Sequence, residues 1–416
     1  MDLTLLAYPF LFLALYFEAF LLVTFLSRPA REMRVRATST RTPKVAVIVP
    51  CWNEESTVKG TADSLLALNY PKDKLSIILV DDGSTDGTGA VMDSYATNPQ
   101  VTVLHTENGG KHAAINKGIE IAKDAELIGC LDADSFVSPE ALREMIGCFD
   151  DPMVAAVTPA MSVSRPKNII QRMQNAEFIM GIALRHILAV VNGLYVTPGP
   201  FSVYRRDVLV ELGGFRFGHQ TEDMEMALRM QRAGYKIDSA TKARVYTTAP
   251  HSVPALVKQR TRWTSGFLRN MLYDYRDLVG NPRYGALGVL VLPLGFTAIA
   301  GGILMTGVLL YQLGTNAFET ALTVSGVPID YTLSTFVPSL SSFGWFYLPL
   351  SLFALLAIVA AAGSIMFILV GKRISDTPAS LTIAIAGWLL LYGLIAPFWL
   401  VRSVADVASG HRRAWR

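Results

Sequence analysis

The sequence predicts an α/β domain of the doubly wound, Rossmann-like type, inserted between membrane-spanning helices. Short apolar runs alternate with helical patterns from about residue 44 to residue 246, which is typical of a doubly wound sheet. Long stretches without charge lie before and after this region. In addition, 51% of the 416 residues are hydrophobic and only 17% are charged, a composition that favours a membrane protein over a soluble enzyme.

The first element, within residues 1–27, is predicted to be transmembrane helix 1. Residues 3–26 contain a single charge, Glu18, and at about 1.5 Å per residue they are long enough to cross the hydrocarbon core. A basic juxtamembrane linker follows over residues 28–42. By the positive-inside rule this places the N-terminus outside and the next domain in the cytosol. Glu18 is expected to face protein or water rather than lipid.

The α/β domain is predicted over residues 43–250. Asp81 and Asp82 directly follow one of its apolar runs, and Asp132 and Asp134 follow another. Ligands of such sheets bind beyond the carboxyl ends of the strands, so both acidic pairs are expected to face one crevice. The apolar runs predict a helix near 55–68 and strands at 44–50, 75–80, 101–104, 127–131, 153–163 and 194–204.

Two further segments are interpreted as interfacial helices. Residues 168–191 have apolar positions at helical spacing but also carry several charged side chains, so they are too polar to span a membrane. Residues 251–285 contain the run Gln259-Arg260-Thr261-Arg262-Trp263. Arginines can grip phosphate oxygens and an indole can stack on a sugar, although an interfacial helix uses the same residues at lipid headgroups.

Residues 286–416 are predicted to be a transmembrane region. Helices are predicted near 286–312, 345–371 and 379–401, and none of them contains a charge. The loop between the first two has no lysine or arginine, which is typical of a loop on the external side of the cell membrane. This topology leaves a basic C-terminus outside, against the positive-inside rule. A further spanning or re-entrant piece within 317–343 would reverse it. The basic residues concerned are Arg412, Arg413 and Arg416.

Charge and cysteine usage exclude other classes of protein. The net charge is only +3, and the basic residues lie beside hydrophobic segments without interleaved aromatics, so nucleic acid is not expected as a partner. The three cysteines, Cys51, Cys130 and Cys148, have no metal-ligand spacing and fall in the predicted cytosolic domain. They are interpreted as reduced residues of the domain core.

The motif residues allow chemistry on a phosphorylated substrate, and each also has a structural explanation. Asp132 and Asp134 can hold a divalent cation through oxygen ligands, but an Asp-x-Asp is also common in turns and N-caps. Asp81 and Asp82 can accept from a uracil imide or a ribose, or simply form a turn. Lys111 follows two glycines at a helix start, where a phosphate can bind. Thr221-Glu222-Asp223 has the residues of an ordinary helix start.

Together, five motifs in this order and spacing resemble those of the membrane-integrated family 2 glycosyltransferases, which include cellulose, hyaluronan, chitin and poly-N-acetylglucosamine synthases. The resemblance covers residues 43–275 by motif and the rest of the chain by architecture. It implies a GT-A fold and an inverting transfer from a UDP-sugar with Mg²⁺ or Mn²⁺. The motifs are Pro50-Cys51-Trp52-Asn53-Glu54-Glu55, Asp81-Asp82-Gly83, Asp132-Ala133-Asp134, Thr221-Glu222-Asp223 and Gln259-Arg260-Thr261-Arg262-Trp263.

The resemblance also implies a role for each motif residue. Asp223 is the general base, Asp132 and Asp134 hold the metal, and Asp132 also contacts the nucleotide. Since a helix neighbour points about 100° away, Glu222→Gln is expected to be milder than Asp223→Asn. The other donor-binding residues are Glu54, Asp81, Asp82, Lys111 and Arg262. The acceptor-binding residues are Gly199, Pro200, Glu222, Gln259, Arg260 and Trp263.

The function expected from this resemblance is processive polymerisation of a UDP-sugar into a β-linked polysaccharide, with translocation through the protein's own helices. The alternative is transfer of a single sugar to a membrane lipid, as in glucosylceramide-synthase-like enzymes. Four spans are few for a channel, although interfacial helices or a homo-oligomer can complete one. A catalytically inactive scaffold is not supported, because every motif acid is present.

Overall fold

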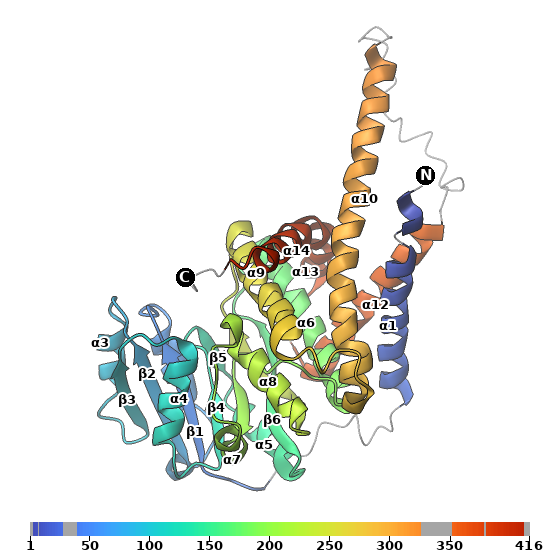
Figure 1. The fold of residues 1–416 in the computed structure, drawn as a ribbon. Coiled ribbons are helices and arrows are strands. Elements are labelled where there is room, and N and C mark those ends of the chain that lie inside the picture. Colours follow the sequence, from blue (N-terminus) through green and yellow to red (C-terminus); the bar gives the residue numbers. More distant parts are fainter. Residues whose placement is uncertain (1–2, 7, 28–39, 326–351, 378–379, 412–416) are drawn as a thin grey trace.

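A mixed sheet forms the centre of the α/β domain (Figure 1). The computed structural model describes residues 3–6, 8–27, 40–325, 352–377 and 380–411, and within them the sheet has eight strands in the order β3-β2-β1-β4-β7-β6-β8-β5. The strands are β1 (Val45–Cys51), β2 (Leu75–Asp82), β3 (Val101–Thr106), β4 (Leu127–Cys130), β5 (Ser135–Val137), β6 (Val154–Val163), β7 (Ser202–Arg205) and β8 (Lys236–Thr247).

The four strands β3, β2, β1 and β4 run parallel, with Val47 opposite both Ile77 and Gly129. Their carboxyl ends therefore meet at one edge of the sheet, where Asp81 and Asp82 complete β2 and Asp132 follows β4. β7 pairs antiparallel with both β4 and β6 and so joins the parallel half to the rest of the sheet. The predicted α/β fold is confirmed.

Helices cover both faces of the sheet, as the doubly wound pattern predicts. Ile48 and Ile78 pack in the same apolar cluster as Ile115 of α4, while Val47 and Ile77 share the opposite cluster with helices α2 and α5. The cysteines Cys51, Cys130 and Cys148 are free and buried, as expected. The domain helices are α2 (Val58–Leu66), α3 (Thr88–Asp93), α4 (Lys111–Ile121), α5 (Ala141–Ile146), α7 (Arg206–Glu211) and α8 (Glu222–Arg232).

Three strands differ from the sequence prediction. β8 is the longest strand, yet it was not predicted, because its Lys236, Asp238, Lys242 and Arg244 interrupt the apolar pattern. β5 has only three residues and pairs with the end of β8. The strand predicted at 194–204 is confined to Ser202–Arg205, since the preceding segment forms a loop that approaches the site described below.

Four helices are long and apolar enough to cross a membrane, within the part of the chain that the structure describes: Tyr8–Ser27, Leu287–Leu322, Ala354–Ser375 and Thr382–Ala408. Glu18 of the first faces protein, as expected, since it accepts a hydrogen bond from Ser364 Oγ at 3.0 Å. The corresponding elements are α1 (Tyr8–Ser27), α10 (Leu292–Ser325), α12 (Leu352–Ser375), α13 (Thr382–Gly387) and α14 (Gly393–Ala408).

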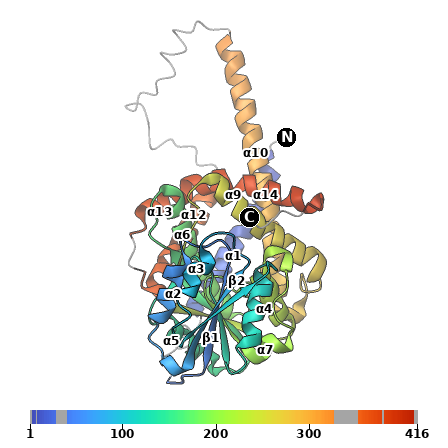
Figure 2. The ribbon, with the colours of Figure 1, turned by 90° about the vertical axis from the view of Figure 1, so that its left-hand side faces the viewer.

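The two predicted interfacial segments are α6 (Ile169–Val190) and α9 (Val253–Arg269). α6 packs against α12 and α13, whereas α9 packs against α14. α1 lies beside α10 and α12. The α13–α14 segment is instead oriented transverse to the axis of α10 (Figures 1 and 2). Residues 28–39 of the predicted linker (28–42), residues 326–343 of the segment predicted to hold a re-entrant piece (317–343) and the arginines after residue 411 lie outside the described residues.

Candidate active site

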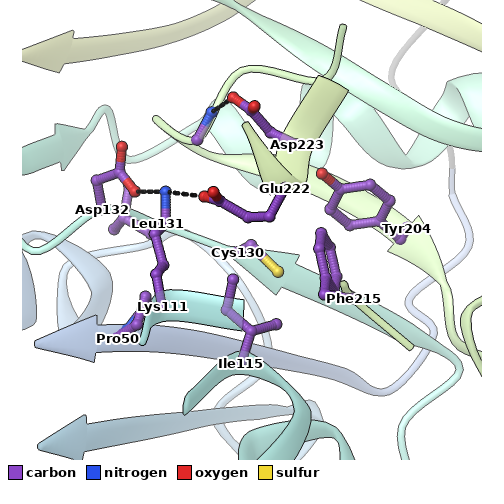
Figure 3. Close-up of a pocket in the computed structure, with 11 residues that line it drawn as sticks. Pro50, Lys111, Ile115, Cys130, Leu131, Asp132, Tyr204, Phe215, Glu222 and Asp223 are labelled. Carbon is purple, nitrogen blue, oxygen red and sulfur yellow. Dashed lines mark hydrogen bonds and ion pairs between the residues drawn. The ribbon is translucent and has the colours of Figure 1, made fainter. Parts of the chain in front are cut away.

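The ammonium of Lys111 joins two acids into one cluster (Figure 3). One acid follows a strand and the other begins a helix. Its Nζ lies 2.6 Å from Asp132 Oδ1 and 2.8 Å from Glu222 Oε1. Gly199 lies against this contact, because a Cβ there would be 2.6 Å from Asp132 Oδ2 and 2.8 Å from Lys111 Nζ. Any side chain at position 199 would therefore disrupt the cluster. The predicted acceptor residue Pro200 follows Gly199 but does not line the same pocket.

Asp82 positions the loop that carries Lys111. Its two carboxylate oxygens accept hydrogen bonds from the backbone amides of Gly109 and Gly110, at 2.8 Å and 2.9 Å. Gly110 has a φ of 85°, a backbone conformation that side chains disfavour, and α4 begins at the next residue. Asp82 at the end of β2 is thus connected to Asp132 after β4 through the loop that ends at Lys111. This connection lies where both acidic pairs were expected to face one crevice.

Asp223 lies at the start of α8, on the other side of Glu222 from Lys111. Its Oδ2 accepts from the Gly199 amide at 3.3 Å, and its carbonyl accepts from the Thr197 hydroxyl at 2.8 Å. Thr221 does not cap the helix, since its hydroxyl donates to the Gly218 carbonyl instead. Thr197 was not predicted to lie beside Asp223, because nothing in its sequence context marks it.

The two adjacent acids have opposite ionisation behaviour. Burial, reinforced by the neighbouring Glu222 carboxylate, raises the pKa of Asp223 to about 6. For Glu222 burial acts in the same direction, but contact with the Lys111 ammonium outweighs it and holds the pKa of Glu222 below its ordinary value. Burial would lower the pKa of Lys111, yet Asp132 and Glu222 keep it well above its ordinary value. Asp223 is therefore the acid suited to exchange a proton near neutral pH.

Glu222, where substitution is expected to be milder than at Asp223, also belongs to this cluster. Glu222 is the first residue of α8 and Asp223 is the second. Both side chains reach the pocket that Lys111 and Asp132 line (Figure 3). Glu222→Gln therefore removes a charge that the site uses.

A left-handed turn precedes Thr221 and is held by α9. Gly218, His219 and Gln220 all have positive φ, of 50°, 54° and 68°. Arg262 Nη1 of α9 donates to the Gln220 carbonyl at 2.8 Å, and the fully buried Asn270, which directly follows α9, donates to the Gly218 carbonyl at 3.3 Å. These contacts hold an unfavourable backbone conformation, and they tie the position of the acidic pair to α9.

The two arginines of the run Gln259-Arg260-Thr261-Arg262-Trp263 have different environments. Arg262 is close enough to Glu222 and Asp223 to favour their ionised forms. Arg260 instead is buried and pairs with Glu177 of α6 at 2.8 Å, and its guanidinium lies 4.2 Å from the centre of the Trp263 ring. Gln259 Oε1 is buried without a hydrogen-bond partner. Of the predicted binding residues in this run, Arg262 is the one beside the acidic cluster.

The remaining predicted donor residues lie around the ends of β1 and β2. Asp81 Oδ1 accepts from the Ser84 amide at 2.9 Å, and Asp81 Oδ2 lies 3.1 Å from Nδ1 of His105. Glu54 Oε2 accepts from the Thr57 hydroxyl at 2.8 Å, and the Glu54 amide donates to Thr88 Oγ1. Asp81 lies at the end of β2 and Glu54 follows β1, so both are on the same edge of the sheet as Asp132.

Asp132 and Asp134 fit a divalent cation in part. No group of three or more His, Cys, Asp or Glu residues is arranged to hold a metal in the described ranges. The two aspartates stand two positions apart just after β4, are partly exposed, and supply the hard oxygen atoms that Mg²⁺ and Mn²⁺ prefer. Asp132 already contacts a cation, the Lys111 ammonium. Such a pair fits an ion that takes its other ligands from a phosphorylated substrate and water.

The arrangement can deprotonate a hydroxyl beside a diphosphate. Asp223 provides a base whose pKa lies near neutrality. Lys111 and Arg262 supply positive charge within the same cluster, where developing negative charge on a leaving phosphate would be stabilised.

Comparison with known proteins identifies relatives of this chain. Poly-beta-1,6-N-acetyl-D-glucosamine synthase of Staphylococcus epidermidis is 27% identical over 248 residues, covering 59% of this chain and 60% of that protein. The first match thus leaves about two fifths of that relative uncovered. A second S. epidermidis protein of the same name is 25% identical over 325 residues, covering 74% of this chain and 78% of that one.

A solved structure shares the fold. The mannosyltransferase PcManGT from Pyrobaculum calidifontis, in complex with GDP-Man and Mn²⁺, has a TM-score of 0.58 and is 21% identical, with 89% of this chain and 100% of that chain covered. Residues 43–266, more than half of the chain, match the family described as glycosyltransferase like family 2. The chain therefore belongs to glycosyltransferase family 2, and it is a glycosyltransferase with a GT-A fold.

Proposed function

We propose that this glycosyltransferase is an inverting, processive enzyme that polymerises a UDP-sugar into a β-linked polysaccharide. The observation that carries the proposal is the position of Asp223 at the carboxyl edge of the sheet. Asp223 has a raised pKa there and lies beside the cluster of Lys111, Asp132 and Glu222. The sequence similarity to poly-beta-1,6-N-acetyl-D-glucosamine synthases supports a polymer as the product.

In the proposed reaction, the acceptor hydroxyl gives its proton to Asp223 as its oxygen bonds to the anomeric carbon of the donor. The bond from that carbon to the diphosphate breaks, and the nucleoside diphosphate leaves from the opposite face, which inverts the configuration. Lys111 and Arg262 stabilise the leaving diphosphate. Glu54, Asp81 and Asp82 line the proposed nucleoside site, while Gly199, Pro200, Glu222, Gln259, Arg260 and Trp263 are assigned to the acceptor side.

We expect activity to depend on a divalent cation held by Asp132 and Asp134. A bound Mg²⁺ or Mn²⁺ would neutralise charge on the diphosphate. Excess EDTA should abolish transfer, and added Mn²⁺ or Mg²⁺ should restore it. Isothermal titration of Mn²⁺ into wild-type protein with UDP present should show binding that is lost in Asp134→Asn. Undiminished activity in EDTA would contradict this assignment.

The protein is proposed to sit in the cell membrane with its catalytic domain in the cytosol and its N-terminus outside. The position of α13–α14 supports a revision of the predicted topology. Contacts to the interfacial helices continue along this segment, from Tyr392 with Glu177 at 3.1 Å to Ser403 with the Thr261 carbonyl at 3.3 Å. On its other face, the exposed side chains Leu390, Leu394 and Phe398 recur every four residues. This segment is therefore proposed to lie along the membrane surface.

This revision predicts a cytosolic C-terminus, in agreement with the positive-inside rule. A single cysteine in place of His411 should react with an impermeant maleimide only after cells are permeabilised, whereas one in place of Glu319 should react in intact cells. The native cysteines are buried, so they will contribute little background. Labelling of His411→Cys in intact cells would restore the topology in which 379–401 spans the membrane.

The alternative, transfer of one sugar to a membrane lipid, is favoured by the small number of candidate spans, four in the described part of the chain. Purified full-length protein should be incubated with each labelled UDP-sugar, with GDP-mannose as a comparison, and with membrane lipids and Mn²⁺ or Mg²⁺. A high-mass product digested by a specific glycosidase is expected. A product extracted into organic solvent would support the lipid transferase instead. Turnover of the GDP-sugar alone would overturn the donor assignment.

A further inference from the structure

His105 links a residue of the proposed nucleoside site to an acid on the domain surface. It lies on β3 directly opposite Asp81 of β2 in the parallel register. Its Nδ1 is 3.1 Å from Asp81 Oδ2, and its Nε2 is 3.0 Å from Asp93 Oδ1 at the end of α3. The imidazole thus bridges two carboxylates carried by two different elements.

The geometry specifies the charge of this histidine. An ionised carboxylate can only accept hydrogen bonds, so both ring nitrogens must carry a proton for both contacts to form. Hydrogen bonds to Asp93 and Asp81 raise the pKa of His105 above its ordinary value, although burial acts in the opposite direction. Burial would raise the pKa of Asp81, but Ser84 and His105 together hold it below its ordinary value.

Asp81 has little freedom to adopt another position. Its side chain is 10% exposed, whereas those of His105 and Asp93 are 50% and 60% exposed. A Cβ on Gly89 of α3 would lie 3.2 Å from Asp81 Oδ2 and 3.4 Å from His105 Cε1, so α3 packs closely over the contact. Ser84 holds the other carboxylate oxygen. The rotamer of Asp81 is therefore set by one backbone amide and one imidazolium.

We propose that His105 is a positioning residue for donor binding: its doubly hydrogen-bonded imidazolium orients the Asp81 carboxylate toward the nucleoside, and Asp93 tunes its charge from the surface. The proposal rests on the proposed nucleotide-sugar function. Donor affinity should then fall as the pH rises through the pKa of His105, because deprotonation turns one N–H donor into a lone pair facing a carboxylate. The rate at saturating donor should not change, because the described ring contacts of His105 are to Asp81 and Asp93, and not to Asp223 or Lys111.

The test is isothermal titration of UDP, and separately GDP, into full-length protein over a range of pH. Variants are compared with wild type as a ratio of Kd at each pH, which cancels the ionisation of the nucleotide itself. His105→Gln cannot titrate, so it should bind roughly tenfold more weakly at low pH, the effect of one lost charge-assisted hydrogen bond, and approach wild type at high pH. Its kcat should stay at the wild-type value.

Asp93→Asn removes the surface charge without touching Asp81. It should move the pH at which affinity falls downward by roughly one unit. His251→Gln is the matched control, since His251 is exposed and only its backbone carbonyl accepts a hydrogen bond among the described residues. A Kd ratio for His105→Gln that does not vary with pH would reduce His105 to a structural residue and overturn the proposal. If wild type binds neither nucleotide, the proposed function fails, and the role of His105 fails with it.

Discussion

Asp223→Asn should yield a folded protein that still binds UDP and makes almost no product. Asparagine keeps the shape of the side chain but cannot accept the acceptor proton, and loss of a general base costs at least about 100-fold in rate. Folding should be spared, because burial raises the pKa of Asp223 and thus makes its charged form unfavourable in the folded protein at neutral pH. The measurements are kcat, UDP affinity and the unfolding temperature.

The pH dependence of kcat is an independent test of Asp223 as the general base. Asp223 must be deprotonated to act, so kcat of the wild type should be low in acid and rise through about pH 6, the pKa of Asp223 in the folded protein. Asp124→Asn is the control, because Asp124 is exposed beyond the far end of α4. A near-normal rate for Asp223→Asn would leave the base unassigned and return Thr221-Glu222-Asp223 to the role of a helix start.

Lys111→Met should impair both stability and turnover. The side chains of Lys111 and Glu222 are 14% and 6% exposed, so the substitution leaves Glu222 and Asp132 close to one another without their shared cation. Breaking a buried ion pair by removing one partner costs about 3–5 kcal/mol. Turnover should also fall, because the charge beside the leaving diphosphate is lost.

Lys117→Met provides a matched control on the same helix. Lys117 is 58% exposed and pairs with Glu120 at 3.2 Å, so its loss should cost less than about 1 kcal/mol. Denaturant unfolding at several pH values separates the two cases. The deficit of Lys111→Met should shrink in acid, because Lys111 holds the pKa of Glu222 below its ordinary value and protonation of Glu222 removes the uncompensated charge. Equal deficits for the two variants at all pH values would show that Lys111 is not the counter-ion of this cluster.

The parts of the fold that sequence analysis predicted are those in which local pattern and tertiary role agree. β1, β2 and β4 are buried on both faces, so they appear as continuous apolar runs, and the aspartates at their ends mark the edge where ligands bind. β8 escaped prediction because it alternates buried and partly exposed residues and carries charges. Some of its buried positions are polar, such as Ser239 and Thr241, so the apolar alternation that marks a half-buried strand is weak.

The candidate site was predicted as a set of motifs, whereas its internal pairing was not. Lys111 and Glu222 lie 111 positions apart, and nothing in either motif indicates that they touch. Arg260 was grouped with Arg262 because the two are close in sequence, yet α9 turns Arg260 toward Glu177 and Arg262 toward Gln220. The role of His105 depends on strand register, which is set by the packing of the whole sheet.

The amino-acid sequence by itself determined the class of protein, the order of its elements and the acids available for chemistry, because composition, periodicity and motif order are local properties. Only the tertiary structure decided the environment of each acid. Glu222 and Asp223 are adjacent in the sequence and have almost the same neighbours along the chain. In the folded protein Glu222 forms an ion pair with Lys111 and Asp223 does not, so the pKa of Glu222 is lowered and that of Asp223 is raised. Ionisation depends on distance and burial in space, and these arise only when the chain is folded.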